Sequence, residues 1–546
     1  MTAVEVTAAR PSAVLDEAHV GDIRGALGTI RVDDFDARRT LSAKMKTLLA
    51  VVGPGLIVMV GDNDAGAFST YGQAGQNYGT RLLWTLLLLI PVLYVNQEMV
   101  LRLGAVTGVG HARLILQRFG KFWGAFEVFD LFILNALTII TEFIGITLAA
   151  GYLGVPKILA VVLAAGVIIS TAFTGSFRRF ERVAFTFCAG SLLLIPLYMM
   201  SHPAGASMVR GFTTPDLPGG SGGMAVVMLL VIGIVGTTVA PWQLFFQQSY
   251  VVDKRITPRF MKYEKADLWI GIVVVVLGAA AVMGATAAAF AGTKGAGNFT
   301  DSAGLARGVA AYGGHLAGAV FAVALLDAAI IGAFAVSLSS AYAIGDVLGM
   351  NHSLHRGVGQ AKGFYAIYVA LICGAATVVL IPGSPLGLIT EGVQVLAGVL
   401  LPAATVFLLL LCNDKAVLGP WVNGRRTNAF TAAVISVLIT LSVILTVSVV
   451  FPHITAGQIL MIIAGCAAAA VAAGGALLAR GTSGGAADEG VASYGDRMMW
   501  RMPPLSELPA PVITGARKVG LIALRGYLAM AMILVVVKVV LMAIGH

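Results

Sequence analysis

The segment GPGLIVMVGDNDAGAFSTYGQAGQNYG, residues 53–79, places two carboxylates inside an apolar run. Asp62 and Asp64 stand where a helix embedded in lipid is expected. An Asp at the centre of a bilayer costs about 2.5–3.5 kcal/mol on insertion scales, so such residues usually face a cavity and mark an ion path. Gly61 and Gly66 permit irregular backbone beside the carboxylates. The segment therefore predicts a transmembrane helix that is broken around a cation site.

The rest of the chain has the composition of a membrane protein. Of its 546 residues, 58% are hydrophobic and only 12% are charged. Apolar runs of about 20 residues, the length that crosses a bilayer core, recur along it. They do not alternate between apolar and polar residues as barrel strands do. We predict an all-α polytopic protein with 12 or 13 transmembrane helices, at 48–77, 82–103, 123–153, 156–175, 181–200, 224–252, 266–292, 315–348, 362–382, 386–412, 429–451, 456–479 and 519–544.

The distribution of charge orients these helices. Lys and Arg concentrate in alternate loops, which places the N-terminus in the cytoplasm by the positive-inside rule. The same distribution explains the net charge of +9 without a nucleic-acid partner. We expect an integral protein of a bacterial inner (plasma) membrane, with the lipid bilayer and a metal ion as its partners.

The composition also divides the chain into four segments. We predict a cytoplasmic N-terminal tail at 1–44 and a transporter core at 45–480. Residues 481–518 are polar and contain Gly and Pro, which is typical of a flexible linker, here cytoplasmic. An additional apolar helix occupies 519–546.

A second break is expected in the segment VVMLLVIGIVGTTVAPWQLFFQQSYVV, residues 226–252. Pro241 lies inside it and removes a backbone donor. A proline kink alone would not indicate a ligand, but breaks in both the first and the sixth span favour two five-helix repeats of inverted topology. The carbonyl groups freed at the breaks, together with Asp64, would form an oxygen-rich site that suits a hard cation.

At these residues the chain resembles the Nramp metal-ion transporters. Residues 53–79 are similar to the family's first-helix segment around its DPGN motif, and VGTTVAPWQLFFQQS, residues 235–249, occupies the place of its MPH motif. Further similar segments are RLGAVTG (102–108), TEFIG (141–145) and VQVLAGVLLP (393–402). The resemblance covers about residues 45–480 and implies the fold and the alternating-access transport of that family.

The departures from the family pattern concern the metal ligands. DPGN has become DAGA, which keeps Asp64 but puts Ala67 in place of the Asn ligand. MPH has become APW, so Ala240 replaces the Met ligand and Trp242 replaces the His. A thioether favours soft transition metals, so its loss weakens selection against Mg²⁺.

The family's proton route is also altered. The resemblance places Ile139 at one of its two helix-3 acids and leaves Glu142 as the other. The chain looks most like the Nramp-related magnesium transporter branch, which implies transport of Mg²⁺ and Mn²⁺ without proton coupling.

The predicted metal site centres on one carboxylate. Asp64 supplies the carboxylate, and Asp62 is either a second ligand or a vestibule charge. The carbonyl groups of Gly61 and Thr237 and the side chain of Gln243 would contact the waters of a partly hydrated ion. The residues expected to shape the site are Ala67, Ala240, Pro241, Trp242 and Glu142.

Three further polar residues are weaker candidates. Asp327 and Glu391 are interpreted as helix-pairing or vestibule residues. Gln394 would stabilise the occluded state, by resemblance only.

The predicted function is a secondary transporter that imports Mg²⁺ and Mn²⁺ and is not proton-coupled. One alternative is a proton-coupled Mn²⁺ or Fe²⁺ transporter, and another is a sodium-coupled organic-solute symporter. The chain contains no HExxH motif, and we expect no enzyme. We expect no cofactor besides the transported ion, and the sequence predicts no oligomeric state.

Overall fold

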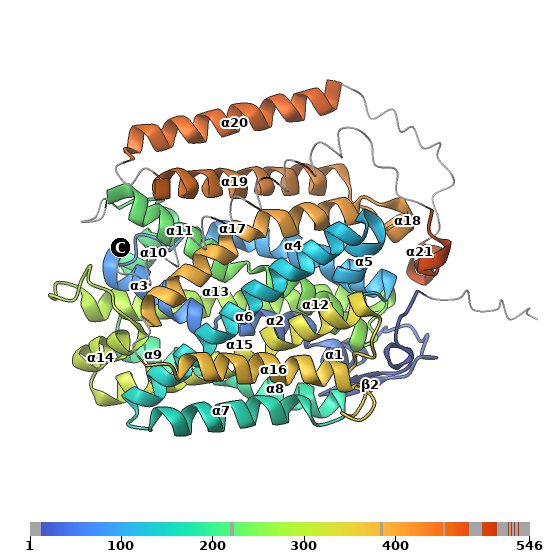
Figure 1. Ribbon diagram of the computed structural model, residues 1–546, viewed down its shortest axis with the longest axis horizontal. Coiled ribbons are helices and arrows are strands. Elements are labelled where there is room, and N and C mark those ends of the chain that lie inside the picture. The colour runs from blue at the N-terminus through green and yellow to red at the C-terminus, as the bar shows by residue number, and fades with distance from the viewer. Residues whose placement is uncertain are drawn as a thin grey trace, which may run out of the picture.

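The computed structural model describes residues 13–218, 223–382, 386–450, 454–479 and 494–509, with isolated positions at 522, 526, 529 and 533. Within them the chain forms a bundle of helices, most of which run along one direction (Figure 1). One antiparallel hairpin, β1 (Ile23–Gly25) and β2 (Gly28–Ile30), lies at an end of the bundle.

The first twelve predicted spans all coincide with helices. Nine of those in the described residues are long and apolar enough to cross a membrane, and a bent pair brings the number to ten. Two further apolar helices are shorter, α7 and residues 457–472 of α20. The chain is therefore an integral membrane protein. Its continuous helices are α4 (Trp84–Thr107), α6 (Lys121–Tyr152), α7 (Lys157–Ala172), α13 (Met261–Phe290), α15 (His315–Leu348), α16 (Lys362–Val379), α17 (Leu386–Cys412), α19 (Arg425–Val450) and α20 (Ala456–Ala479).

Other predicted spans consist of several helical pieces. The fifth span is α8 (Phe177–Gly190) followed by α9 (Leu194–Ser201). Short helices that were not predicted lie in the connections between spans: α5 (His111–Phe119), α10 (Gly205–Thr213), α14 (Ser302–Gly313) and α18 (Lys415–Leu418). The predicted span at 519–544 lies outside the described residues, apart from the isolated positions.

The two predicted breaks are present. The first span consists of α1 (Leu41–Val51), α2 (Pro54–Gly61) and α3 (Ala65–Tyr78), and the sixth consists of α11 (Gly223–Thr238) and α12 (Pro241–Asp253). Because α2 contacts α12 while α3 contacts α11, the two broken helices run antiparallel, as inverted repeats require.

An additional bend of 50° separates α1 from α2. Gly53, at the bend, has a φ of 150°, a conformation that favours glycine. Pro54 then starts α2, where its missing N–H costs nothing. The carboxylate of Asp267 on α13 accepts hydrogen bonds from the N–H groups of Gly53 (3.1 Å), Gly55 (2.6 Å) and Leu56 (3.2 Å). A side chain from another helix thus caps the start of α2.

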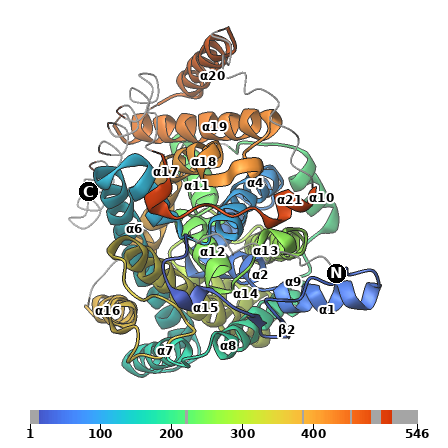
Figure 2. The same ribbon diagram turned by 90° about the vertical axis from the view of Figure 1, so that its right-hand side faces the viewer.

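The described part of the N-terminal segment packs on one end of the bundle, which faces the viewer in Figure 2 and is the predicted cytoplasmic end. Asp16 is buried and pairs with Arg356, at 2.6 Å between Oδ1 and Nη2. The Arg255 guanidinium donates to the Ala18 carbonyl at 2.8 Å. The Ala26 N–H of the hairpin donates to Glu181 of α8. Residues 13–30 therefore cover the ends of α8 and α12.

Residues 494–509, which include α21 (Tyr494–Met499) and fall inside the predicted linker, cover the same end of the bundle. Trp421 donates its indole N–H to the Arg497 carbonyl at 2.9 Å. Arg118 donates to the Pro509 carbonyl at 2.7 Å. This part of the chain thus contacts helix ends on the side of the bundle that faces the viewer in Figure 2.

Candidate metal-ion site

The first break is held open by carboxylates. Asp64 caps α3, where its Oδ1 accepts the Ala67 N–H at 2.8 Å. In a continuous helix the Ala65 N–H would donate to the Gly61 carbonyl. Here it donates instead to Oε2 of Glu142 on α6, at 3.1 Å. The Gly61 carbonyl is thereby left without its usual donor.

The second break frees a carbonyl because a proline follows it. The Thr237 carbonyl would accept from residue 241 in a continuous helix, but Pro241 has no N–H. Thr238, the last residue of α11, shares a hydrogen bond of 2.7 Å with the hydroxyl of Tyr71 on α3. The two breaks therefore lie beside each other, and each leaves one carbonyl without its helical partner.

A chain of polar side chains joins the breaks. Gln243 of α12 donates its amide Nε2 to Oδ1 of Asp62. Its Oε1 accepts from Nε2 of Gln97 on α4 at 2.8 Å. The other Asp62 oxygen is buried and has no hydrogen-bond partner among the described residues. Asp62 and Gln243 thus contact each other directly across the two breaks.

Neighbouring helices close tightly around these residues. A Cβ atom on Gly332 of α15 would lie 2.8 Å from Cδ of Glu142 and 2.9 Å from Cβ of Asp64, closer than real Cβ atoms approach. A Cβ atom on Gly66 would overlap the amide of Gln394 on α17. Glycine at both positions therefore allows α15 and α17 to approach the first break.

Trp242 packs against the first break. Its ring atom Cη2 would lie 3.5 Å from a Cβ atom on Gly61, and its side chain is buried. Its carbonyl accepts the Ser339 hydroxyl of α15 at 3.0 Å. Ala67 and Ala240, at the start of α3 and the N-cap of α12, are also buried and present only methyl groups.

The site is closed to solvent and rich in oxygen. Asp62, Glu142 and Gln243 are 0% exposed and Asp64 is 3% exposed. In the described part of the chain, no three His, Cys, Asp or Glu side chains are grouped so that they could hold one metal ion. A cation at the breaks would therefore rely on one or two carboxylates, main-chain carbonyls and water, which is the ligand set typical of Mg²⁺.

The weaker candidates lie around this site. Gln394 lies against Gly66, and its Nε2 is buried without a partner among the described residues. Asp327 lines a separate pocket with Asn63, whose Oδ1 is likewise unpaired within the described bundle. Glu391 accepts from Nε2 of Gln73 on α3 at 3.1 Å.

The sequence reasoning missed Asn63, Gln97 and Tyr71 as polar neighbours of the breaks. Asn63 stands between Asp62 and Asp64 in the sequence, and this placement alone could have marked it as a polar residue of the first break. Gln97 and Tyr71 are recognisable only once α4 and α3 are packed against the sixth span.

An ion pair lies between the breaks and the end of the bundle that carries the N-terminal hairpin. Nζ of Lys254, at the end of α12, is 2.6 Å from Oε1 of Glu181 and donates to the Val52 carbonyl at 2.7 Å. Both side chains are completely buried. The pair joins the bend between α1 and α2 to α8 and α12.

Comparison with known proteins agrees with this architecture. The family model described as "Natural resistance-associated macrophage protein-like" (Nramp) matches residues 55–448. A divalent metal cation transporter MntH of Ralstonia nicotianae is 28% identical over 417 residues, 72% of this chain and 89% of that protein. A Klebsiella pneumoniae protein of the same name is 24% identical over 441 residues, 76% and 96% of the two chains. These relatives are bacterial, which supports the predicted bacterial inner membrane.

A solved structure shares the fold. The manganese transporter of Eremococcus coleocola aligns with a TM-score of 0.61 at 20% identity, over 82% of this chain and 97% of that one. This likeness confirms the predicted all-α polytopic fold.

Proposed function

Because the chain belongs to the Nramp family, and the relatives named above are divalent metal cation transporters, we propose that it imports Mg²⁺ and Mn²⁺ by alternating access without moving protons. The ion enters from outside and binds between the two breaks. A conformational change then opens the site to the cytoplasm.

The observation that carries the proposal is the pair of freed carbonyl groups beside carboxylates. The Ala65 N–H donates to Glu142 rather than to Gly61, and Pro241 has no N–H for Thr237. Asp64 and Asp62 supply negative charge at the same place. An ion held by a few oxygens keeps several of its waters, which suits Mg²⁺ because Mg²⁺ dehydrates reluctantly.

The side chains at Ala67 and Ala240 support Mg²⁺ as the transported metal, because they provide no ligand atoms. Methyl groups stand at Ala67 and Ala240, so these positions offer neither an amide nor a thioether ligand. Without sulfur, the site has no preference for soft transition metals. Trp242 is buried against Gly61 and cannot carry a proton at neutral pH.

Uptake needs an energy source when no proton moves with the metal. A membrane potential that is negative inside favours entry of a divalent ion by about 4.6 kcal/mol per 100 mV. This corresponds to a gradient of more than a thousandfold at equilibrium, since about 1.4 kcal/mol is tenfold. The membrane potential alone can therefore drive accumulation of the divalent ion inside the cell.

The experiment is uptake of Mg²⁺ into proteoliposomes that contain a magnesium indicator and a pH indicator, with a negative internal potential. We expect saturable Mg²⁺ entry without acidification of the lumen. Asp64→Ala should abolish entry, while Asp36→Asn, a change in an exposed carboxylate of the N-terminal segment, should not. No Mg²⁺ entry, with Mn²⁺ entry accompanied by protons, would instead identify a proton-coupled carrier.

A further inference from the structure

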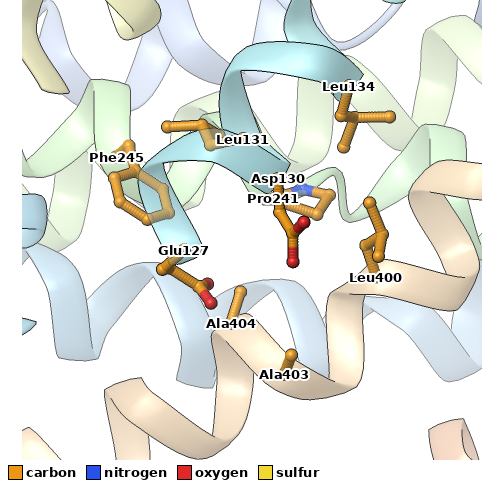
Figure 3. Close-up of a pocket in the computed structure, with 9 residues that line it drawn as sticks. All are labelled: Glu127, Asp130, Leu131, Leu134, Pro241, Phe245, Leu400, Ala403 and Ala404. Atoms are coloured by element: carbon orange, nitrogen blue, oxygen red, sulfur yellow. The ribbon is translucent and has the colours of Figure 1, made fainter. Parts of the chain in front are cut away.

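A second pair of carboxylates lies in the bundle apart from the site between the breaks. Glu127 and Asp130 line a small pocket formed by α6, α12 and α17 (Figure 3). The two residues are three apart on α6, so they share one helix face. Figure 3 shows both carboxylates turned toward α17. The remaining lining residues are apolar, and Pro241, the first residue after the second break, is one of them.

The carboxylates lack partners inside the protein. Glu127 and Asp130 are 5% and 6% exposed. Oε2 of Glu127 and both carboxylate oxygens of Asp130 are buried and have no hydrogen-bond partner in the described residues. Neither residue belongs to an ion pair with any described Lys, Arg or His. Buried carboxylates are normally paired, coordinate a metal or are neutralised by a proton, so these unpartnered oxygens are available to a cation.

The chemistry of the pocket defines the class of that occupant. Its polar side-chain atoms are carboxylate oxygens, and no His, Cys or Met side chain lines it. Oxygen ligands select hard cations such as Mg²⁺ or Mn²⁺ over softer metals. Mg²⁺ commonly binds through one or two carboxylates and fills its other positions with water. Two like charges on adjacent turns repel each other, and a divalent cation between them removes that repulsion.

The position of the pair gives the site its role. At 1.5 Å per residue, Asp130 lies about 14 Å along α6 from its cytoplasmic start at Lys121 and about 18 Å before Glu142. The pocket also touches the second break through Pro241. The pair is thus on the cytoplasmic side of the predicted metal site.

We propose that Glu127 and Asp130 form a second divalent-cation site, at which the ion stops between the breaks and the cytoplasm. The role as a stopping point rests on the proposed transport function, whereas cation binding by the pair does not. A second site lowers the electrostatic barrier that the ion must cross to leave the protein. An ion that leaves Asp64 meets the carboxylates of Glu127 and Asp130 before it reaches bulk water.

The test counts bound Mn²⁺ on the full-length protein in detergent, from the loss of the free-ion EPR signal, and then displaces it with MgCl₂. We expect two sites for each wild-type chain and one for Glu127→Gln/Asp130→Asn. Asp36→Asn/Glu507→Gln removes the same charge from exposed positions and should retain two sites. If the double variant does not fold, Asp130→Asn alone should weaken one site at least tenfold and leave the other unchanged.

The outcomes separate this proposal from the proposed function. Asp64→Ala should also retain a single site, and that site should be lost when Glu127→Gln/Asp130→Asn is added. A wild-type chain that binds one ion, lost in Asp64→Ala but kept in Glu127→Gln/Asp130→Asn, would overturn the second site and leave the transport proposal standing. Two ions retained in Asp64→Ala would contradict the transport site instead.

Discussion

Replacing Lys254 by methionine should loosen the packing at the predicted cytoplasmic end of the bundle. In the structure its Nζ is 2.6 Å from Oε1 of Glu181, and both side chains are completely buried. The Glu181 carboxylate also accepts from the Tyr250 hydroxyl at 3.2 Å and from the Ala26 N–H of the N-terminal hairpin. Methionine keeps the volume of the lysine chain but leaves the carboxylate without its counter-ion.

The size of the effect follows from the burial of the pair. Removing one partner of a buried ion pair costs about 3–5 kcal/mol, because an uncompensated charge remains inside the protein. Opening the cytoplasmic side lets water reach Glu181 and recovers much of this cost. Since about 1.4 kcal/mol corresponds to a factor of ten, the population of opened forms should rise about a hundredfold to several thousandfold.

Hydrogen–deuterium exchange of the hairpin peptide 23–30 measures this population, because the Ala26 N–H is protected only while it contacts Glu181. Lys254→Met should accelerate exchange of this peptide strongly. Lys254→Met/Glu181→Gln removes both charges and should return exchange close to the wild-type rate. Unchanged exchange in the single variant, or equally fast exchange in both variants, would refute the prediction that the Lys254–Glu181 pair holds this end of the bundle together.

Other predictions concern the site and the cytoplasmic loops. Gly332→Ala should reduce Mg²⁺ uptake about tenfold, because overpacking beside Asp64 costs about 1–3 kcal/mol, while Gly374→Ala, with open space around it, should not. Ala240→Met should shift competition uptake toward Mn²⁺ over Mg²⁺, because it adds a thioether at the break. Burial alone would lower the pKa of His352, but the Asp346 carboxylate, 3.0 Å away, raises this pKa to about 9. The stabilisation of the folded state by the protonated His352 is complete below about pH 6.5 and is lost as the pH rises through about 9. The melting temperature should therefore fall over that range more in the wild type than in His352→Gln.

The sequence predicts the membrane spans and the breaks because their causes are local. Apolar length marks the helices, Pro241 removes a specific donor, and Asp64 offers a side-chain cap for the helix that follows it. The antiparallel placement of the breaks was predicted from their positions in the first and sixth spans, and α2 and α3 do contact α12 and α11.

Other features depend on contacts between distant segments. Asp267 caps α2 from more than 200 residues away, and no local pattern marks it. The N-terminal segment has the composition of a polar tail, yet its buried Asp16 pairs with Arg356, which only the folded loops bring near it. Glu127 and Asp130 are visible in the sequence as acids near a helix start, where carboxylates are common. Their lack of partners emerges only once α12 and α17 are packed against them.

The reversal potential of the transport current tests the central claim most directly. For a carrier that moves only a divalent cation, this potential should shift by about 30 mV for each tenfold change in the Mg²⁺ gradient. It should not respond to a pH gradient, and Asp64→Ala should carry no current. A shift of the reversal potential when only the proton gradient is changed would contradict uncoupled Mg²⁺ transport and identify a proton-coupled carrier.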